Sequence, residues 1–116
     1  MKDPTRVRVL KAAEDLAVEV YRVTGAFPSV ERFGLTSQMR RAAVSVGSNI
    51  AEGCGMHGDR AFVAYLHRSL GSGHELEFQA RLAVRLGYAN AADLDGLAKL
   101  ITSVCKMLSR LIVALR

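Results

Sequence analysis

The chain has 116 residues, half of them hydrophobic, which suffices for one domain with its own core and excludes wholesale disorder. Sixteen basic against eleven acidic residues give a net charge of +5, a balance that permits contact with nucleic acid without requiring it. The N-terminus lacks a secretory signal and no uncharged run approaches the roughly 20 residues that span a bilayer, so we expect a cytoplasmic protein with no membrane role.

The first predicted element is a helix that begins with Asp3 as N-cap and Pro4 as first helical residue, and ends near Thr24. The link that follows, TGAFPSVERFG, is expected to place Phe27 and Phe33 in the core as anchors. The apolar stripe of this helix comprises Val9, Ala13, Leu16, Val20 and Val23.

A second helix is predicted to begin at Thr36 as N-cap and to end at Gly53, in the left-handed conformation that glycine adopts freely. Its inward residues are Met39, Ala43, Val46 and Ile50. A defined polar stripe on the other side indicates buried hydrogen bonds at a helix or subunit seam in preference to a ligand site. That stripe comprises Gln38, Ser45, Asn49 and Glu52 and leads to Gly53.

The third helix is expected from Gly58 and Asp59 to about Leu86, continuous through Gly71 and Gly73 in preference to a break there. Small residues in the middle of its stripe would let a neighbouring helix approach closely. The stripe comprises Phe62, Leu66, Ser69, Gly73, Leu76, Ala80 and Ala83.

The fourth helix is predicted to start with Asn90 as N-cap and Asp93 in the first turn. Apolar residues then recur at steps of three and four: Leu94, Leu97, Ile101, Val104, Leu108, Leu111 and Leu115. No stretch shows the period-two alternation of a strand. The sequence therefore predicts an all-α, antiparallel up-and-down four-helix bundle, a single domain over residues 1–116.

Large apolar residues also lie outside these stripes on the last two helices. A lone bundle would leave them in water, so we expect a homo-oligomer closed by cyclic symmetry, with Leu100 and Met107 at the subunit seam. The residues concerned are Tyr65, Leu70, Phe78, Leu100, Met107 and Ile112.

The stretch SNIAEGCGMHGD, residues 48 to 59, is the one compact candidate for a chemical site. Cys54, His57 and Asp59 offer three metal ligands, whereas a structural zinc site needs four. A nucleophilic pair of Cys54 and His57 lacks a group to orient the histidine. We therefore interpret the stretch as a turn between helices, with no metal, no cofactor, no catalytic residue and no enzymatic activity.

Basic residues gather on three segments. Arg40 and Arg41 point about 100° apart, so one is expected to pair with Glu31, Glu52 or an acid of another subunit while the other faces solvent. The last helix carries three on one face, Lys99, Lys106 and Arg110, and the first helix carries Arg6, Arg8 and Lys11.

The few aromatic residues are expected in the core and not on a base-stacking surface, so nucleic-acid binding would be directed at the backbone. These residues are Tyr21, Phe27, Phe33, Phe62 and Phe78.

Residues 21 to 55, YRVTGAFPSVERFGLTSQMRRAAVSVGSNIAEGCG, resemble the signature of a bacterial four-helix-bundle family, named after the protein encoded in 23S rRNA intervening sequences. The chain departs from that family at Leu10, Met56, Gly58 and Gly73. The resemblance implies a homopentamer around a central channel and kinship with accessory proteins of diversity-generating retroelements, which are thought to bind nucleic acid and a reverse transcriptase. The matching positions include Tyr21, Phe27, Pro28, Glu31, Gly34, Leu35, Gln38, Arg40, Arg41, Ala42, Ser45, Asn49, Ile50, Ala51, Glu52 and Gly53.

Charge and resemblance together predict a non-enzymatic, oligomeric bundle that binds the RNA or DNA backbone through a basic surface. The alternative is a scaffold or adaptor ring that docks a protein partner such as a reverse transcriptase, with the charge serving only solubility. The predicted basic surface comprises Arg6, Arg8, Lys11, Arg40, Arg41, Lys99, Lys106 and Arg110.

Overall fold

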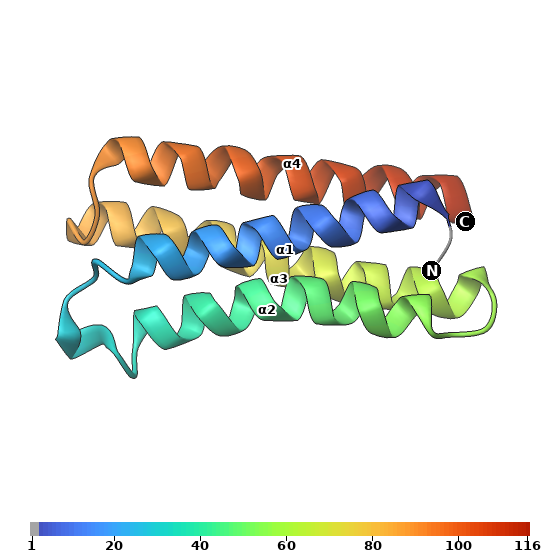
Figure 1. Cartoon of the computed structure of the whole chain (residues 1–116), viewed down its shortest axis with the longest axis horizontal. Coiled ribbons are helices and arrows are strands. Elements are labelled where there is room, and N and C mark those ends of the chain that lie inside the picture. Colours follow the sequence, from blue (N-terminus) through green and yellow to red (C-terminus); the bar gives the residue numbers. More distant parts are fainter. Residues whose placement is uncertain (1–2) are drawn as a thin grey trace.

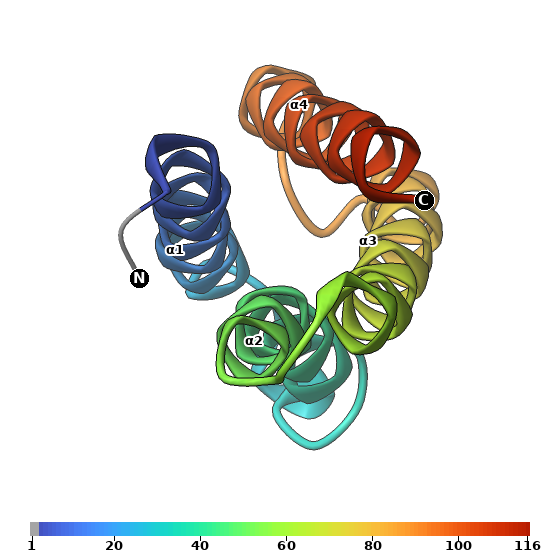
Figure 2. The ribbon, with the colours of Figure 1, turned by 90° about the vertical axis from the view of Figure 1, so that its right-hand side faces the viewer.

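The computed structural model describes residues 3–116, which form four α-helices and one short 3-10 helix, with no strand in that range. The helices run alternately up and down along a body of 44 × 24 × 20 Å (Figure 1). Seen from one end they stand in chain order around a common core, and the last helix returns beside the first (Figure 2). The elements are α1 (Pro4–Thr24), η1 (Ser29–Glu31), α2 (Leu35–Cys54), α3 (Asp59–Leu86) and α4 (Ala91–Leu115). The predicted all-α four-helix bundle is confirmed.

The core consists of the four apolar stripes read from the sequence. Every member is buried except Leu115, which is half-buried near the end of α4. Leu16, Leu66 and Leu108, from three different helices, have no exposed surface at all. Burying a side chain of this size contributes about 1.5–3 kcal/mol, so the stripes supply the main driving force for the bundle.

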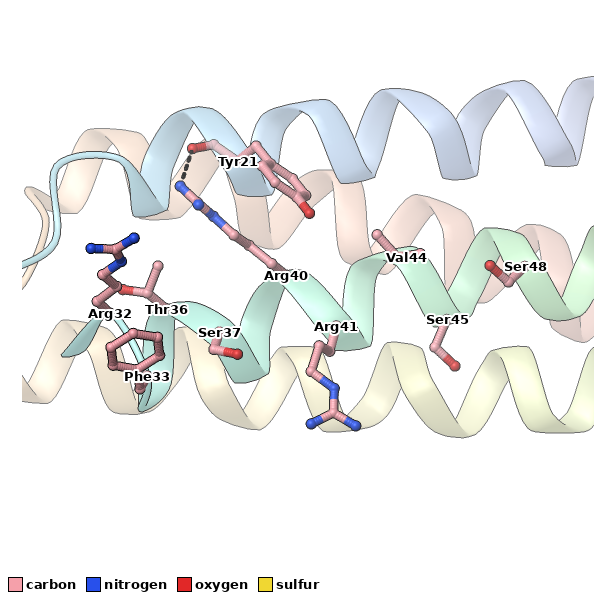
Figure 3. A pocket seen from close by; sticks show the side chains of 10 residues that line it. All are labelled: Tyr21, Arg32, Phe33, Thr36, Ser37, Arg40, Arg41, Val44, Ser45 and Ser48. Carbon is pink, nitrogen blue, oxygen red and sulfur yellow. Dashed lines mark hydrogen bonds between the residues drawn. The ribbon is translucent and has the colours of Figure 1, made fainter.

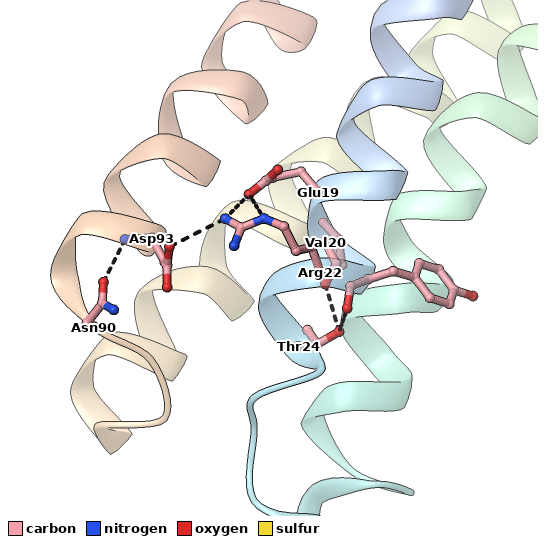
Figure 4. A network of polar contacts seen from close by, with 7 residues as sticks. Glu19, Val20, Arg22, Thr24, Asn90 and Asp93 are labelled. Carbon is pink, nitrogen blue, oxygen red and sulfur yellow. Dashed lines mark hydrogen bonds and ion pairs between the residues drawn. The ribbon is translucent and has the colours of Figure 1, made fainter.

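Two predicted caps fix the starts of α1 and α4. The Thr5 amide donates to Oδ1 of Asp3, and the Asp93 amide donates to Oδ1 of Asn90, each over 2.8 Å. Arg22, near the end of α1, binds both Glu19 and Asp93, so it ties α1 to the first turn of α4 (Figure 4).

The predicted N-cap of α2 is wrong. The helix begins at Leu35, and Thr36 lies inside its first turn with 8% of its surface exposed. Oε1 of Glu31 accepts the Leu35 amide proton at 2.9 Å. A carboxylate four residues upstream thus accepts a hydrogen bond from an amide at the start of α2, which has no partner within the helix, because η1 turns the chain back toward it.

The predicted end of α2 is also wrong. The helix passes through Gly53 to Cys54, and Gly55 caps it in a right-handed conformation with φ −85°. Glycine is needed at position 53 for space: a Cβ there would lie 2.7 Å from Cδ1 of Phe62 and 2.8 Å from Cβ of Tyr65. The backbone of α2 therefore lies directly against α3 at this point.

Short polar side chains extend this close seam between α2 and α3. Ser69, fully buried, donates its hydroxyl proton to the Val46 carbonyl over 2.7 Å. One turn away, the hydroxyl oxygens of Ser45 and Ser72 are 2.8 Å apart. The two helices are thus joined by hydrogen bonds that a purely apolar stripe would not supply.

α3 is one continuous helix, as predicted. Gly71 and Gly73 both lie in its interior without a break. A Cβ on Gly73 would lie 2.7 Å from Sγ of Cys105 on α4, whereas Gly71 has open space around it. Only Gly73 is therefore explained by close packing.

Five of the seven aromatic residues were predicted in the core, and this is right for Phe27 and Phe62 and wrong for the other three. Phe27 packs against Tyr88 from the turn between α3 and α4, with the ring centroids 5.6 Å apart. Phe33 is exposed and therefore does not serve as a second anchor; Tyr88 packs on Phe27 at this end of the bundle instead. The exposed aromatic residues are Tyr21, Phe33 and Phe78, with exposed fractions of 47, 88 and 66%.

The apolar residues expected in water on α3 and α4 are mostly covered within the single chain. Ile112 is buried, and Leu100 and Met107 are half-buried against the core. Of these two helices, the second half of α3 has the most exposed large apolar residues, Phe78, Leu82, Val84 and Leu86, while α4 exposes Val113. No helix within residues 3–116 has the length and apolar character needed to cross a membrane.

Candidate functional site

A groove of about 710 Å³ runs along the outer face of α2, where the end of α1 and the η1–α2 link meet it (Figure 3). Two aromatic rings, three arginines and several serine hydroxyls line it, and no carboxylate is among its lining residues. We call it the Phe33 groove. Its volume is in the range of sites that bind small ligands or short segments of larger ones.

The link that carries Phe33 is held at several points. The Gly34 amide donates to the Glu31 carbonyl over 2.9 Å, and Oε2 of Glu31 accepts the Tyr88 hydroxyl proton over 2.5 Å. A Cβ on Gly34 would lie 2.4 Å from Oε1 of Glu31, so glycine leaves the space in which that carboxylate caps α2. Phe33 is thus an exposed side chain on a well-anchored link.

The contacts of Glu31 also shift two pKa values. The hydrogen bond from the Leu35 amide, together with that from the Tyr88 hydroxyl, lowers the pKa of the Glu31 carboxyl. The bond to Glu31 raises the pKa of Tyr88, since the phenol proton is shared with an anion. At neutral pH the carboxylate is therefore charged, and each of its oxygens accepts one hydrogen bond.

The two adjacent arginines of α2 differ sharply in their surroundings. Arg40 is half-buried, donates from Nε to the Thr24 hydroxyl over 2.9 Å and from Nη2 to the Tyr21 carbonyl over 3.4 Å. Its guanidinium also lies 4.6 Å from the Tyr21 ring centroid (Figure 3). Arg40 thus joins α2 to α1 instead of pairing with an acid of this chain. Arg41 is exposed and forms no ion pair with residues 3–116.

The basic face of α4 lies on a different part of the surface. Lys99 pairs with Asp95 over 3.1 Å, while Lys106 and Arg110 are exposed and form no ion pair within residues 3–116. Two shallow hollows of about 370 and 360 Å³ share Lys106 and include hydroxyl groups of threonine and serine. Cations and hydroxyls therefore lie side by side on this face, which we call the α4 basic face, and Glu77 of α3 lines one of its two hollows.

The basic residues of α1 are mostly engaged. Arg6 pairs with Asp59 at the start of α3 over 3.5 Å, and its guanidinium lies 4.2 Å from the Phe62 ring centroid. Lys11 pairs with Asp15, and Arg8 donates to the Thr5 hydroxyl. The predicted basic residues are thus spread over three helices, and the most available are Arg41, Lys106 and Arg110.

The predicted polar stripe of α2 divides in two. Asn49 donates from Nδ2 to the Ser45 carbonyl over 2.9 Å and to its hydroxyl over 3.1 Å, next to the hydroxyl contact with α3. Gln38 and Glu52 are exposed. Ser45 and Asn49 therefore belong to a helix seam, and a subunit seam at Gln38 and Glu52 stays a prediction.

The turn around Cys54 offers no reactive thiol. Burial raises the pKa of Cys54 and of Cys105, which lowers the thiolate fraction of each. His57 is exposed in the turn. Among the side chains of residues 3–116, no three His, Cys, Asp or Glu residues are grouped so that they could hold a metal ion.

The sequence reading missed the Phe33 groove because it assigned Phe33 to the core and gave no role to Arg32. One signal was present: the run Glu31-Arg32-Phe33-Gly34 places charges directly before the ring, which is typical of a solvent-facing turn. Tyr88, which covers Phe27, was also missed, since it lies in a short turn far along the chain.

Fold and surface define a small basic helical bundle with a groove beside its longest link. The chain belongs to the 23S rRNA-intervening sequence protein family, whose model matches residues 5–110. It is similar to the crystal structure of a protein with unknown function from the S23 ribosomal protein family of Bacteroides thetaiotaomicron. The identity is 21% and the TM-score 0.87, over 94% of this chain and 98% of the other. No curated protein matched the sequence. The resemblance of residues 21 to 55 to this family is therefore confirmed.

Proposed function

We propose that the protein is a non-enzymatic bundle that binds the backbone of RNA or DNA through its basic surface. The observation that carries the proposal is the α4 basic face, where Lys106 and Arg110 are exposed and form no ion pair within residues 3–116, since Glu77, the acid beside them, pairs with Arg81. Phosphate oxygens are bound in proteins by such cations together with serine and threonine hydroxyls, and Thr102, Ser103 and Ser109 supply hydroxyls here. Arg41 adds an exposed cation on α2.

The binding unit is proposed to be a homo-oligomer, and the fivefold number rests on the family resemblance. Exposed apolar residues on α3, Phe78 and its neighbours Leu82 and Leu86, support an assembly because water contacts them in the single chain. A ring would repeat the basic face around its axis and multiply the attraction for one phosphate backbone.

The test is fluorescence anisotropy of labelled structured RNA and duplex DNA over a series of salt concentrations. We expect affinity to fall with salt, by a logarithmic slope of about 0.9 per phosphate contact on duplex DNA. A double Lys106→Gln, Arg110→Gln variant should bind more weakly and show a smaller slope.

The matched control is Arg60→Gln with Arg85→Gln, which removes the same charge from exposed cations of α3 that lie outside the predicted basic surface and line neither hollow of the α4 basic face. Equal losses in the two double variants would show that only net charge matters. Undetectable binding at low salt would overturn the proposal and favour a scaffold that docks a protein partner.

A further inference from the structure

Phe33 is the most exposed large apolar side chain of the described residues, with 88% of its surface in water. A single exposed apolar residue on a surface is ordinary. The link that carries this one is anchored, however, because Glu31 accepts hydrogen bonds from the Leu35 amide and the Tyr88 hydroxyl. An anchored backbone has less conformational freedom to lose when a ligand stacks on the ring.

The charge around the ring is positive. The guanidinium carbon of Arg32 lies 5.3 Å from the Phe33 ring centroid, and Arg41 lines the same groove (Figure 3). Neither arginine forms an ion pair within residues 3–116, and no carboxylate lines the groove itself, although Glu75 shares a neighbouring hollow with Arg41 and the charged Glu31 precedes Arg32 in the chain. The groove therefore attracts an anion beside an aromatic surface.

Neutral hydrogen-bonding groups complete the groove. Ser37 and Ser48 line it with hydroxyls, and Tyr21 contributes a half-exposed ring whose other side faces Arg40. A flat apolar ring, two guanidinium groups and serine hydroxyls match a base joined to phosphates. Because pairing hides the faces of bases in a duplex, only an unpaired segment could stack on Phe33.

We propose that the Phe33 groove binds an unpaired segment of nucleic acid, with one base stacked on Phe33 and the flanking phosphates on Arg32 and Arg41. This inference rests on the proposed function and adds a preference for single strands over duplexes. It also revises the expectation that the aromatic residues are unavailable for stacking.

The test uses a single-stranded RNA of about 12 nucleotides, in the range of known single-strand sites, and an abasic strand of the same length. Phe33→Leu keeps an apolar side chain but loses the ring, so we expect about tenfold weaker binding of the RNA. Binding of the abasic strand should be the same for both proteins. Val7→Ala is the control, since Val7 is also exposed but lies at the start of α1, away from the groove and from the apolar residues of α3.

A spectroscopic readout is available because the chain contains no tryptophan. Phe33→Trp should retain the affinity of the wild type, and its fluorescence should be quenched as the RNA binds. Val7→Trp, at the start of α1, should show no quenching.

Equal affinity of Phe33→Leu and wild type, or an unquenched Trp at position 33, would overturn the inference while leaving the proposed function in place. A lower mass of Phe33→Leu in light scattering would also overturn it, because Phe33 would then be a contact between copies. Absence of binding to every strand and duplex would overturn both proposals.

Discussion

Gly53→Ala is the sharpest test of how α2 and α3 approach each other. The added Cβ would lie 2.7 Å from Cδ1 of Phe62 and 2.8 Å from Cβ of Tyr65, well inside the optimal carbon separation of about 3.5–4 Å. Phe62 is 1% exposed and the Tyr65 Cβ is fixed to its own backbone, so neither moves without shifting α3. Alanine gains about 1 kcal/mol of helix propensity over glycine. Overpacking costs about 1–3 kcal/mol, so we expect a net loss of about 1 kcal/mol in the free energy of unfolding.

The measurement is urea unfolding followed by circular dichroism, at one protein concentration because assembly affects apparent stability. Gly71→Ala and Gly96→Ala are matched controls, since both glycines lie inside helices with open space around a built Cβ. They should raise the free energy of unfolding by up to about 1 kcal/mol. If Gly53→Ala gave the same gain as these controls, the tight contact between α2 and α3 would be refuted.

Three further outcomes follow from individual contacts. Because the pKa of Glu31 is lowered by folding from its ordinary value of 4.5, its stabilising effect is present above that value and is lost as pH falls through the folded pKa. The stability difference between wild type and Glu31→Gln should therefore be largest at neutral pH and shrink in acid; a difference independent of pH would contradict this. Arg40→Lys should lower the free energy of unfolding by about 1 kcal/mol, because lysine cannot reproduce the planar guanidinium contacts. Arg41→Lys should leave the free energy of unfolding unchanged. If urea unfolding gave the same loss for both variants, Arg40 would not have the separate role of joining α2 to α1. Phe78→Asp should reduce the mass seen by light scattering, whereas Val18→Asp, exposed on α1, should not; an unchanged mass for Phe78→Asp would remove α3 from the interface.

The helices and their buried faces were predictable because each has a strong period and few competing signals. The stripe of α4, from Leu94 to Leu111, is buried as its spacing indicates. The caps Asp3 and Asn90 were predictable for the same local reason, since a short polar side chain stood just before each periodic run.

The link between α1 and α2 was less predictable because its contacts come from distant parts of the chain. The partner of Glu31 is Tyr88, 57 residues away, and no local pattern brings the two together. Phe33 was misplaced because an apolar residue without a period has no indicated face. Gly53 was misread since glycine near a helix end serves either a left-handed turn or a close approach, and only the position of Phe62 decides between them.

The carboxylate of Glu31 connects these observations at one end of the bundle. One of its oxygens caps α2 and the other accepts the Tyr88 hydroxyl proton, so a single side chain fixes both the start of a helix and the link before it. Phe33 therefore stands exposed on the link that this carboxylate anchors. Glu31 forms no ion pair with Arg32 among the described residues. The three arginines that line the groove form no ion pair within residues 3–116, whereas Arg6, Lys11, Arg22, Arg81 and Lys99 are paired with acids elsewhere on the surface.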